Sequence, residues 1–295
     1  MKYHKLGNSD IEVSEISFGC MSLEVEKNPD STSSLLREAH DKGINFFDTA
    51  DLYNRGLNEE VVGKALKPYR DEVIISTKVG NVWNEDGSGW EWNPTKEYIL
   101  TGVNESLRRL QTEYIDLYML HGGTIDDPID EIIEAFDRLK DQGKIRAYGI
   151  SSIRPNTIRQ YVERSRMDCV MMQYGLLDRR PEEESLDLLA EHDISVITRG
   201  TLGKGLLIDK APHDYQGYSR QEVEALQKVV NNTGNPISVA VQYVLQHPAV
   251  ASAVLGIRTK EQLDEIIQAS DQPIQASQLE AVKEILEPKF YEQHR

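Results

Sequence analysis

The sequence predicts an α/β fold, a (β/α)8 barrel of the TIM type with an N-terminal β-hairpin and extra C-terminal helices. Three observations predict it. The chain has 295 residues, which suits one α/β barrel. Eight short apolar runs alternate with segments whose apolar residues recur at helical spacing. Most of these runs lack apolar/polar alternation, which is typical of parallel strands covered on both faces. We therefore expect one barrel domain over residues 1–295.

The expected elements follow in strand–helix order. The strands are expected at Ile16–Cys20, Ile44–Thr49, Val73–Lys78, Ile115–His121, Ile145–Ser151, Cys169–Tyr174, Ile194–Arg199 and Ala251–Gly256. The helices carry apolar residues at i, i+3 and i+4. They are expected at Ser33–Lys42, Glu59–Leu66, Tyr98–Leu110, Ile129–Asp141, Thr157–Arg164, Glu182–His192, Ser238–Gln246 and Glu261–Ala269.

Three segments lie outside this repeat. Lys2–Val13 contains an Asn-Ser-Asp turn between short apolar pieces, which predicts a hairpin that closes the bottom of the barrel. Additional helices are expected near Arg220–Val230 and Ser277–Leu286.

Two helix starts carry sequence signals of their own. Asp127 followed by Pro128 predicts an N-cap with proline at the first helical position. Thr259 and Gln262 have the spacing of a capping box.

A doubly wound parallel sheet is the alternative fold. Such sheets commonly bind dinucleotides at a G-x-G-x-x-G turn after an early strand. No early strand of this chain is followed by that turn, so a cofactor site of the Rossmann kind has no candidate.

The charge balance restricts the partners. The formal net charge is −16, from 49 acidic and 33 basic residues, and this charge repels nucleic acid and anionic membranes at long range. No stretch approaches the roughly 18 apolar residues of a membrane span. We expect a cytoplasmic protein that binds neither nucleic acid nor membrane.

Cys20 and Cys169 lie in apolar runs without metal-ligand spacing, so we expect two buried thiols and no metal site.

Polar side chains stand at the ends of successive expected strands. They are Asp48, Lys78, His121, Ser151 with Ser152, and Gln173. The active site of an α/β barrel lies at the C-terminal ends of its strands. Each residue alone has an ordinary structural explanation, such as a helix cap or a strand-end lysine. Because they gather at the same end of the barrel, these side chains together predict an active site there.

Tyr53 is the candidate proton donor of this site. The ordinary pKa of tyrosine, near 10, is too high for efficient proton donation at neutral pH. A neighbouring Lys78 is expected to lower that pKa, and Asp48 to hold Lys78 in place. His121 is expected to orient and polarise a substrate carbonyl.

These four residues and their settings resemble the aldo-keto reductases. Asp48 and Tyr53 stand in G-I-N-F-F-D-T-A-D-L-Y-N, Lys78 in I-I-S-T-K, and His121 in Y-I-D-L-Y-M-L-H. The similarity covers nearly the whole chain and resembles the branch that includes channel β-subunits. It implies reduction of a small aldehyde or ketone with NADPH, with hydride transfer to the carbonyl carbon and a proton from Tyr53. We expect a monomer or a weak oligomer.

The resemblance also implies which residues hold the cofactor. Ser151, Ser152 and Gln173 correspond to the residues that bind the nicotinamide carboxamide, and the Thr201–Leu207 loop to one that covers the pyrophosphate. Arg258 corresponds to a residue on the 2′-phosphate of NADPH, although an exposed loop arginine is the plain alternative. The full set is Gly19, Asp48, Ser151, Ser152, Gln173, Arg199, Gly200, Thr201, Leu202, Lys204, Gly205, Gly256, Arg258, Thr259 and Gln262.

Three positions depart from the family pattern. Ser152 stands where asparagine is usual, and Ile266 stands where an asparagine commonly contacts adenine. Arg199 stands where many members stack a tyrosine on the nicotinamide. A guanidinium also stacks on rings, but its charge disfavours an oxidised, cationic ring. These departures bear on cofactor affinity more than on the reaction.

All three tryptophans, Trp83, Trp90 and Trp92, fall in one loop after the third strand. One or two of these rings are expected to wall a substrate pocket for carbonyl compounds with an apolar or aromatic portion. Packing of the loop onto the barrel is an equal alternative.

Two other functions compete with the reductase. A regulatory or redox-sensing protein would bind NADPH with little turnover, as channel β-subunits do. A metal-dependent barrel hydrolase would need His and Asp ligands clustered at the strand ends, and only His121 is available there.

Overall fold

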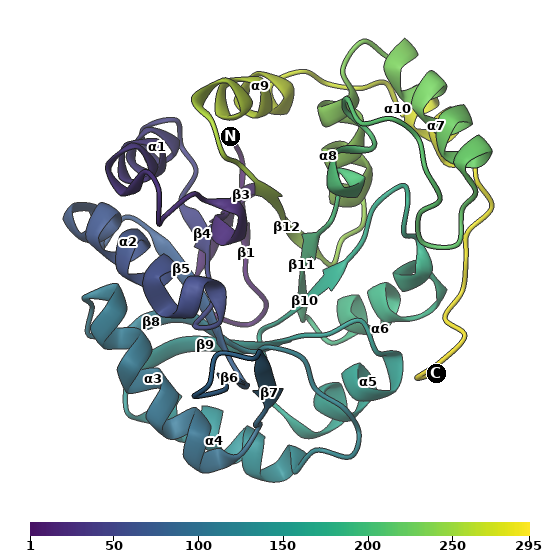
Figure 1. Ribbon diagram of the computed structural model, residues 1–295. Helices are drawn as coiled ribbons and strands as arrows, with labels where there is room; N and C mark the ends of the chain where they lie inside the picture. The colour runs from purple at the N-terminus through teal and green to yellow at the C-terminus, as the bar shows by residue number, and fades with distance from the viewer.

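The computed structural model describes residues 1–295 and confirms the barrel (Figure 1). Eight parallel strands close on themselves in the order β10-β11-β12-β3-β4-β5-β8-β9. Their bounds are β3 Ile16–Gly19, β4 Phe46–Asp48, β5 Ile74–Val79, β8 Ile115–Leu120, β9 Ile145–Ser151, β10 Cys169–Gln173, β11 Ser195–Arg199 and β12 Val250–Gly256. Nearly every residue of these strands is buried, which explains why their sequences lack alternation.

The helices form a ring around the strands (Figure 1). Their bounds are α1 Pro29–Asp41, α2 Leu57–Leu66, α3 Lys96–Leu110, α4 Ile129–Asp141, α5 Pro155–Arg164, α6 Ser185–Glu191, α8 Pro236–Leu245 and α9 Lys260–Ser270. Several begin earlier than the apolar spacing predicts. Pro29, Pro155 and Pro236 each open a helix, because proline fits the first turn without losing a hydrogen bond.

The N-terminal hairpin closes the bottom of the barrel, as predicted. Strands β1 Tyr3–Lys5 and β2 Glu12–Ser14 pair antiparallel. Leu6, Ile11 and Val13 belong to a 13-residue apolar cluster with residues of the barrel strands, among them Phe46 and Met171. The hairpin thus fills the barrel interior from below, which leaves the opposite end free for chemistry.

A second hairpin was not predicted. Strands β6 Asn81–Trp83 and β7 Trp90–Trp92 pair antiparallel within the connection from β5 to α3, with Trp83 opposite Trp90. The sequence carries a signal for it, because N-V-W and W-E-W flank a Gly-containing turn.

One of the two predicted helix caps is wrong and the other is partly right. Helix α4 begins at Ile129, so Pro128 takes the N-cap position. The Asp127 carboxylate instead accepts from the backbone N–H of Thr124 and from Trp92 Nε1. Thr259 caps α9 as predicted by accepting from Gln262 N–H. The reciprocal bond differs, because Gln262 Oε1 accepts from the Arg258 N–H.

The remaining additions lie on the flank of the barrel. Helices α7 Arg220–Asn232 and α10 Ala276–Lys283 confirm the extra C-terminal helices. The C-terminal segment then runs past α7 and ends beside α5 (Figure 1), where the Asn156 N–H donates to the His294 carbonyl.

Cys20 and Cys169 are free and buried, as predicted. No helix combines the length and apolar character needed to span a membrane.

Candidate active site

The register of the barrel places the predicted strand-end residues around one mouth. Asp48 on β4 pairs with Gly19 on β3 and with Ser76 on β5. Gln173 on β10 pairs with Arg199 on β11, and His121 directly follows β8 with its N–H bonded to the Val79 carbonyl. The carboxyl ends of the strands therefore carry these side chains together.

Lys78 is the most buried charge at this mouth. Its side chain is 1% exposed, and its Nζ lies 2.7 and 2.8 Å from the two carboxylate oxygens of Asp48. The third Nζ proton goes to the Thr49 carbonyl at 2.7 Å. Ser76 Oγ donates to Asp48 Oδ1 at 2.6 Å. The ammonium group is fully bonded, and its pKa is raised because Asp48 and Tyr53 together outweigh the effect of burial.

Tyr53 stands over this pair. Lys78 Nζ lies 5.3 Å from the centroid of the Tyr53 ring, and the ring meets that of His121 edge-on with centroids 6.0 Å apart. The segment from Asp48 to Tyr53 is short, so the residue that ends β4 also fixes where the phenol can lie. Tyr53, Lys78 and His121 therefore form one cluster although they come from three different β/α units of the barrel.

The pKa of Tyr53 is raised, which corrects the expectation of a lowered value. Burial of the phenol is the largest cause, while Lys78 acts in the opposite direction. The sequence indicated the cation but not the desolvation, which disfavours the phenolate more strongly. Tyr53 is therefore a protonated phenol at neutral pH, with a cation placed to stabilise its anion.

His121 is held as a neutral imidazole. Burial, followed by the charges of Lys78 and Arg199, lowers its pKa to about 3. Neither ring nitrogen has a hydrogen-bond partner within the chain, and Nδ1 is buried. Both nitrogens are thus left for a ligand or for water.

Gln173 and Arg199 form a polar pair beside the cluster. Arg199 Nη1 donates to Gln173 Oε1 at 3.1 Å, while the buried Gln173 Nε2 has no partner. Ser151 ends β9, and the Oγ of buried Ser152 accepts from the Arg154 N–H. An orphaned buried amide donor beside two serines fits a ligand that offers a carbonyl oxygen, such as a carboxamide.

The loop after β11 has the backbone that close approach to a phosphate requires. Gly200, Gly203, Lys204 and Gly205 all have positive φ, so three of these four positions use the conformational freedom of glycine. Thr201 is buried, and its Oγ1 bonds that of Thr198 at 3.0 Å. Leu202 is half-buried, and Lys204 is exposed and carries the only charge among the residues from Thr201 to Gly205.

Arg258, Thr259 and Gln262 line a separate hollow of about 320 Å³. It lies between the start of α9 and the segment around α1, which contributes Glu24 and Asn28. The Arg258 guanidinium is exposed and forms no ion pair in the chain. Gly19 and Gly256 are neighbours in the β3–β12 register, between this hollow and Asp48. Ile266 is buried in the main core and does not line the hollow.

The three tryptophans are held differently. Trp90 is 53% exposed. Half-buried Trp92 lies against Gly80 and Gly122 at the ends of β5 and β8 and donates to Asp127 at 3.0 Å. Half-buried Trp83 donates from Nε1 to the Leu52 carbonyl at 3.1 Å, so it faces the segment that carries Tyr53.

Asp51 is a titratable group that the sequence reasoning missed. It lies two residues before Tyr53 on the outer side of the barrel, in a hollow of about 220 Å³ that Trp83, Tyr98 and Arg109 also line. Burial, followed by the neighbouring Glu59, raises the pKa of Asp51 to about 8. The only sequence signal was a second aspartate in D-T-A-D-L-Y.

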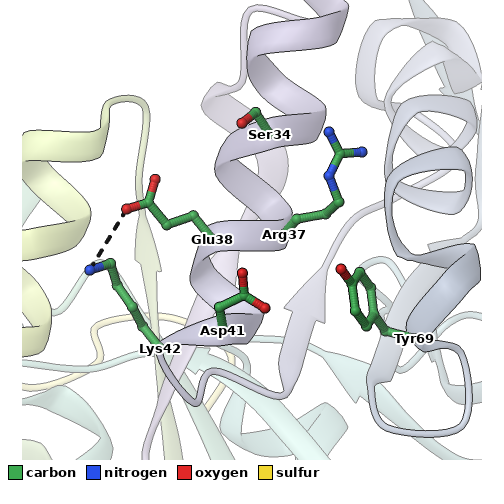
Figure 2. A pocket seen from close by; sticks show the side chains of 6 residues that line it. All are labelled: Ser34, Arg37, Glu38, Asp41, Lys42 and Tyr69. Atoms are coloured by element: carbon green, nitrogen blue, oxygen red, sulfur yellow. Dashed lines mark ion pairs between the residues drawn. The ribbon is translucent and has the colours of Figure 1, made fainter.

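A larger hollow on the barrel exterior is unrelated to this cluster. Figure 2 shows the residues that line it: Ser34, Arg37, Glu38 and Asp41 of α1, Lys42 directly after the helix, and Tyr69. Arg37 lies on the side of the helix toward Tyr69, whereas Glu38 and Lys42 lie on the other side. The one ion pair among these residues, from Lys42 to Glu38 at 3.7 Å, joins the last turn of α1 to the residue that follows the helix. Surface pairs of this kind contribute little to stability.

Comparison with known proteins places this geometry in a family. The model of the aldo/keto reductase family matches residues 15–287. The chain is 47% identical to the uncharacterized oxidoreductase YqkF of Bacillus subtilis, and the alignment covers all of both proteins. It is 34% identical to the NADH-specific methylglyoxal reductase of Escherichia coli, over 73% of this chain and 72% of that protein.

A solved structure is similar over its whole length. The holo form of the aldo-keto reductase AKR11C1 from Bacillus halodurans superposes with a TM-score of 0.95 and is 47% identical. The match covers 100% of this chain and 99% of that one.

The Asp51 carboxyl group is expected to make stability depend on pH. Its folded-state pKa, about 8, exceeds the ordinary 3.8, so its stabilising contribution is complete below about pH 4 and is lost as the pH rises through about 8. Thermal unfolding of Asp51→Asn and wild type should therefore show a Tm difference in favour of the variant that grows by a few degrees between about pH 5 and pH 9. The same change at exposed Asp126 serves as the control. An equal difference at both pH values would contradict the raised pKa.

Proposed function

The chain belongs to the aldo/keto reductase family, and we propose that it reduces aldehydes and ketones to alcohols with NADPH, with Tyr53 as the proton donor. The observation that carries this proposal is the buried cluster at the barrel mouth, in which an ion-paired Lys78 lies beneath a protonated Tyr53 and a neutral His121. Family membership makes the chain an oxidoreductase, and the cluster supports the specific reaction.

Residues on β9, β10 and β11 would hold the nicotinamide. The orphaned Gln173 Nε2 is a buried donor for the carboxamide oxygen, with Ser151 and Ser152 beside it. The Arg199 guanidinium, held by Gln173 Oε1, offers a flat face for the ring. When bound, the reduced nicotinamide supplies a hydride to the carbonyl carbon.

Tyr53 would deliver the proton to the carbonyl oxygen. Its raised pKa keeps the hydroxyl protonated until charge develops on that oxygen. Lys78 then stabilises the phenolate, and the interaction is strong because the Lys78 ammonium group is buried away from water. Asp48 weakens this stabilisation because its carboxylate partly neutralises the positive charge of Lys78, but the same ion pair keeps Lys78 in place.

His121 would orient the substrate. With a pKa of about 3 it stays neutral over the physiological range, so it donates one hydrogen bond to the carbonyl oxygen without competing as an acid. A neutral donor at this position keeps Tyr53 as the sole proton source.

The preference for NADPH over NADH rests on Arg258. Its unpaired guanidinium lines the hollow at the start of α9 with Thr259 and Gln262, and it suits the fork geometry of a phosphate. Because the chain as a whole is acidic, such local basic groups matter for any anionic ligand. The loop from Gly200 to Gly205 would cover the pyrophosphate, with Lys204 adding a charge.

Substrates are proposed to carry an apolar or aromatic portion. Of the six exposed large apolar side chains, four lie at the mouth end of the barrel: Met21 after β3, Trp90 after β5, Ile125 after β8, and Phe290 on the C-terminal segment. Trp92 packs between the ends of β5 and β8. We assign the apolar wall of the substrate pocket to Trp90 and Trp92.

The setting proposed is the cytoplasm, with the chain acting on small carbonyl compounds as a monomer or weak oligomer. Two free, buried thiols fit a reducing compartment.

Replacing Tyr53 with phenylalanine should remove the acid while leaving the cofactor site intact. Carbonyl-dependent loss of NADPH absorbance is expected to fall at least about 100-fold, with NADPH binding unchanged. Tyr98→Phe removes a hydroxyl bonded to the Asn81 carbonyl and is the control, with near-normal turnover. Full turnover by Tyr53→Phe would refute Tyr53 as the donor. NADPH that binds but is never consumed by the wild type would point to the regulatory function.

Arg258→Ala should separate the two nicotinamide cofactors. Loss of a charge-assisted contact worth about 1.5–3 kcal/mol predicts a roughly 10- to 100-fold higher KM for NADPH, while the KM for NADH stays the same. Arg37→Ala, at the exterior hollow of Figure 2, is the matched control. Equal changes for both cofactors would contradict a 2′-phosphate contact.

A further inference from the structure

The turn that carries Tyr53 has an unusual backbone. Asn54 has φ 48° and ψ 38°, Arg55 has φ 54° and ψ 41°, and Gly56 has φ 86°. Two successive residues with side chains thus occupy the left-handed region directly after the proposed acid. Such a conformation persists only where the surroundings enforce it.

The β6–β7 hairpin supplies that enforcement. Trp83 Nε1 donates to the Leu52 carbonyl at 3.1 Å, one residue before Tyr53. The Arg55 guanidinium, two residues after Tyr53, lies 4.9 Å from the centroid of the Trp83 ring. Arg55 Nη2 also reaches the Gly87 carbonyl in the hairpin turn, at 3.5 Å. One indole therefore contacts the chain on both sides of Tyr53.

The other anchors of the turn are weaker or come from elsewhere. The Arg55 N–H shares the Leu52 carbonyl with Trp83, at a long 3.4 Å. The exposed Asn54 side chain donates a hydrogen bond from Nδ2 to Glu26 Oε1 at 3.2 Å. Gly56 lies so close to Arg109 of α3 that a Cβ there would stand 2.6 Å from Arg109 Cδ. The indole of Trp83 is thus the main side-chain bond to the backbone of this turn.

We propose that Trp83 and Arg55 are positioning residues that hold the Tyr53 turn in the geometry needed for proton donation. This inference rests on the proposed role of Tyr53 and gives Trp83 a role apart from the substrate wall. The hydrogen bond fixes the Leu52–Tyr53 peptide, and the stacked guanidinium stabilises Arg55 in its left-handed conformation. Loosening either contact lets the phenol leave its place above Lys78 without changing the residues assigned to the cofactor.

The test compares Trp83→Phe, which keeps a ring but loses the N–H, with wild type. We expect kcat for carbonyl reduction to fall about 5- to 10-fold, while KM for the carbonyl and the Kd of NADPH stay within about twofold. Hydrogen–deuterium exchange of the peptide spanning residues 51–57 should become faster. Arg55→Gln should lower kcat in the same way, and Arg55→Lys, which keeps a cation for the ring, should restore most of it. Tyr98→Phe, which loosens the start of the same hairpin without touching Leu52, should leave both readouts unchanged.

The outcomes separate the two proposals. Faster exchange together with a lower kcat in Trp83→Phe supports the positioning role. Unchanged exchange, or faster exchange with an unchanged kcat, overturns it. A general loss of cofactor binding would also overturn it, because the defect would then not be confined to the turn. Failure of the proposed function shows itself independently, as full turnover by Tyr53→Phe.

Discussion

The site depends on one buried ion pair. Removing an ammonium group from water costs several kcal/mol, and the cost is offset only when the partner geometry is good. Lys78 meets this condition, because both oxygens of Asp48 and the Thr49 carbonyl take its three protons. The Asp48 carboxylate in turn accepts a hydrogen bond from Ser76 Oγ. Asp48 and Thr49 lie at the end of β4, and Ser76 and Lys78 lie on the adjacent β5, so the register of β4 against β5 determines whether a buried cation exists at the mouth at all.

The surroundings of that cation set the protonation states of the residues near it. Burial keeps the Tyr53 phenol protonated and the His121 imidazole neutral, while Lys78 favours the phenolate and disfavours the imidazolium. The strand-borne groups are fixed by the barrel, whereas Tyr53 lies on a strained turn that needs support from the β6–β7 hairpin. The rigid barrel thus supplies the electrostatics, and the connections supply the proposed acid and the proposed substrate wall.

Sequence reasoning predicted the barrel because burial on both faces of the strands leaves a pattern in the residues, and the family motif located Asp48, Tyr53, Lys78 and His121. It did not predict effects that depend on the third dimension. The raised pKa of Tyr53 follows from desolvation, which no motif encodes. The bond from Trp83 to Leu52 joins residues 31 positions apart, and the capping role expected of Asp127 gave way to a contact with Trp92. The hairpin of tryptophans left a weak alternation that was too short to decide between strand and loop.

In the proposed reaction, the charge of Lys78 makes Tyr53 an effective acid. The most direct measurement is single-turnover carbonyl reduction with NADPH by the double variant Lys78→Met with Asp48→Asn, which leaves no buried charge unpaired, at concentrations that saturate the cofactor site. We expect a rate at least about 100-fold below that of the wild type, with cofactor binding retained. A rate within a few-fold of the wild type would show that the proton reaches the substrate without help from the buried cation, and would contradict the proposed role of Lys78.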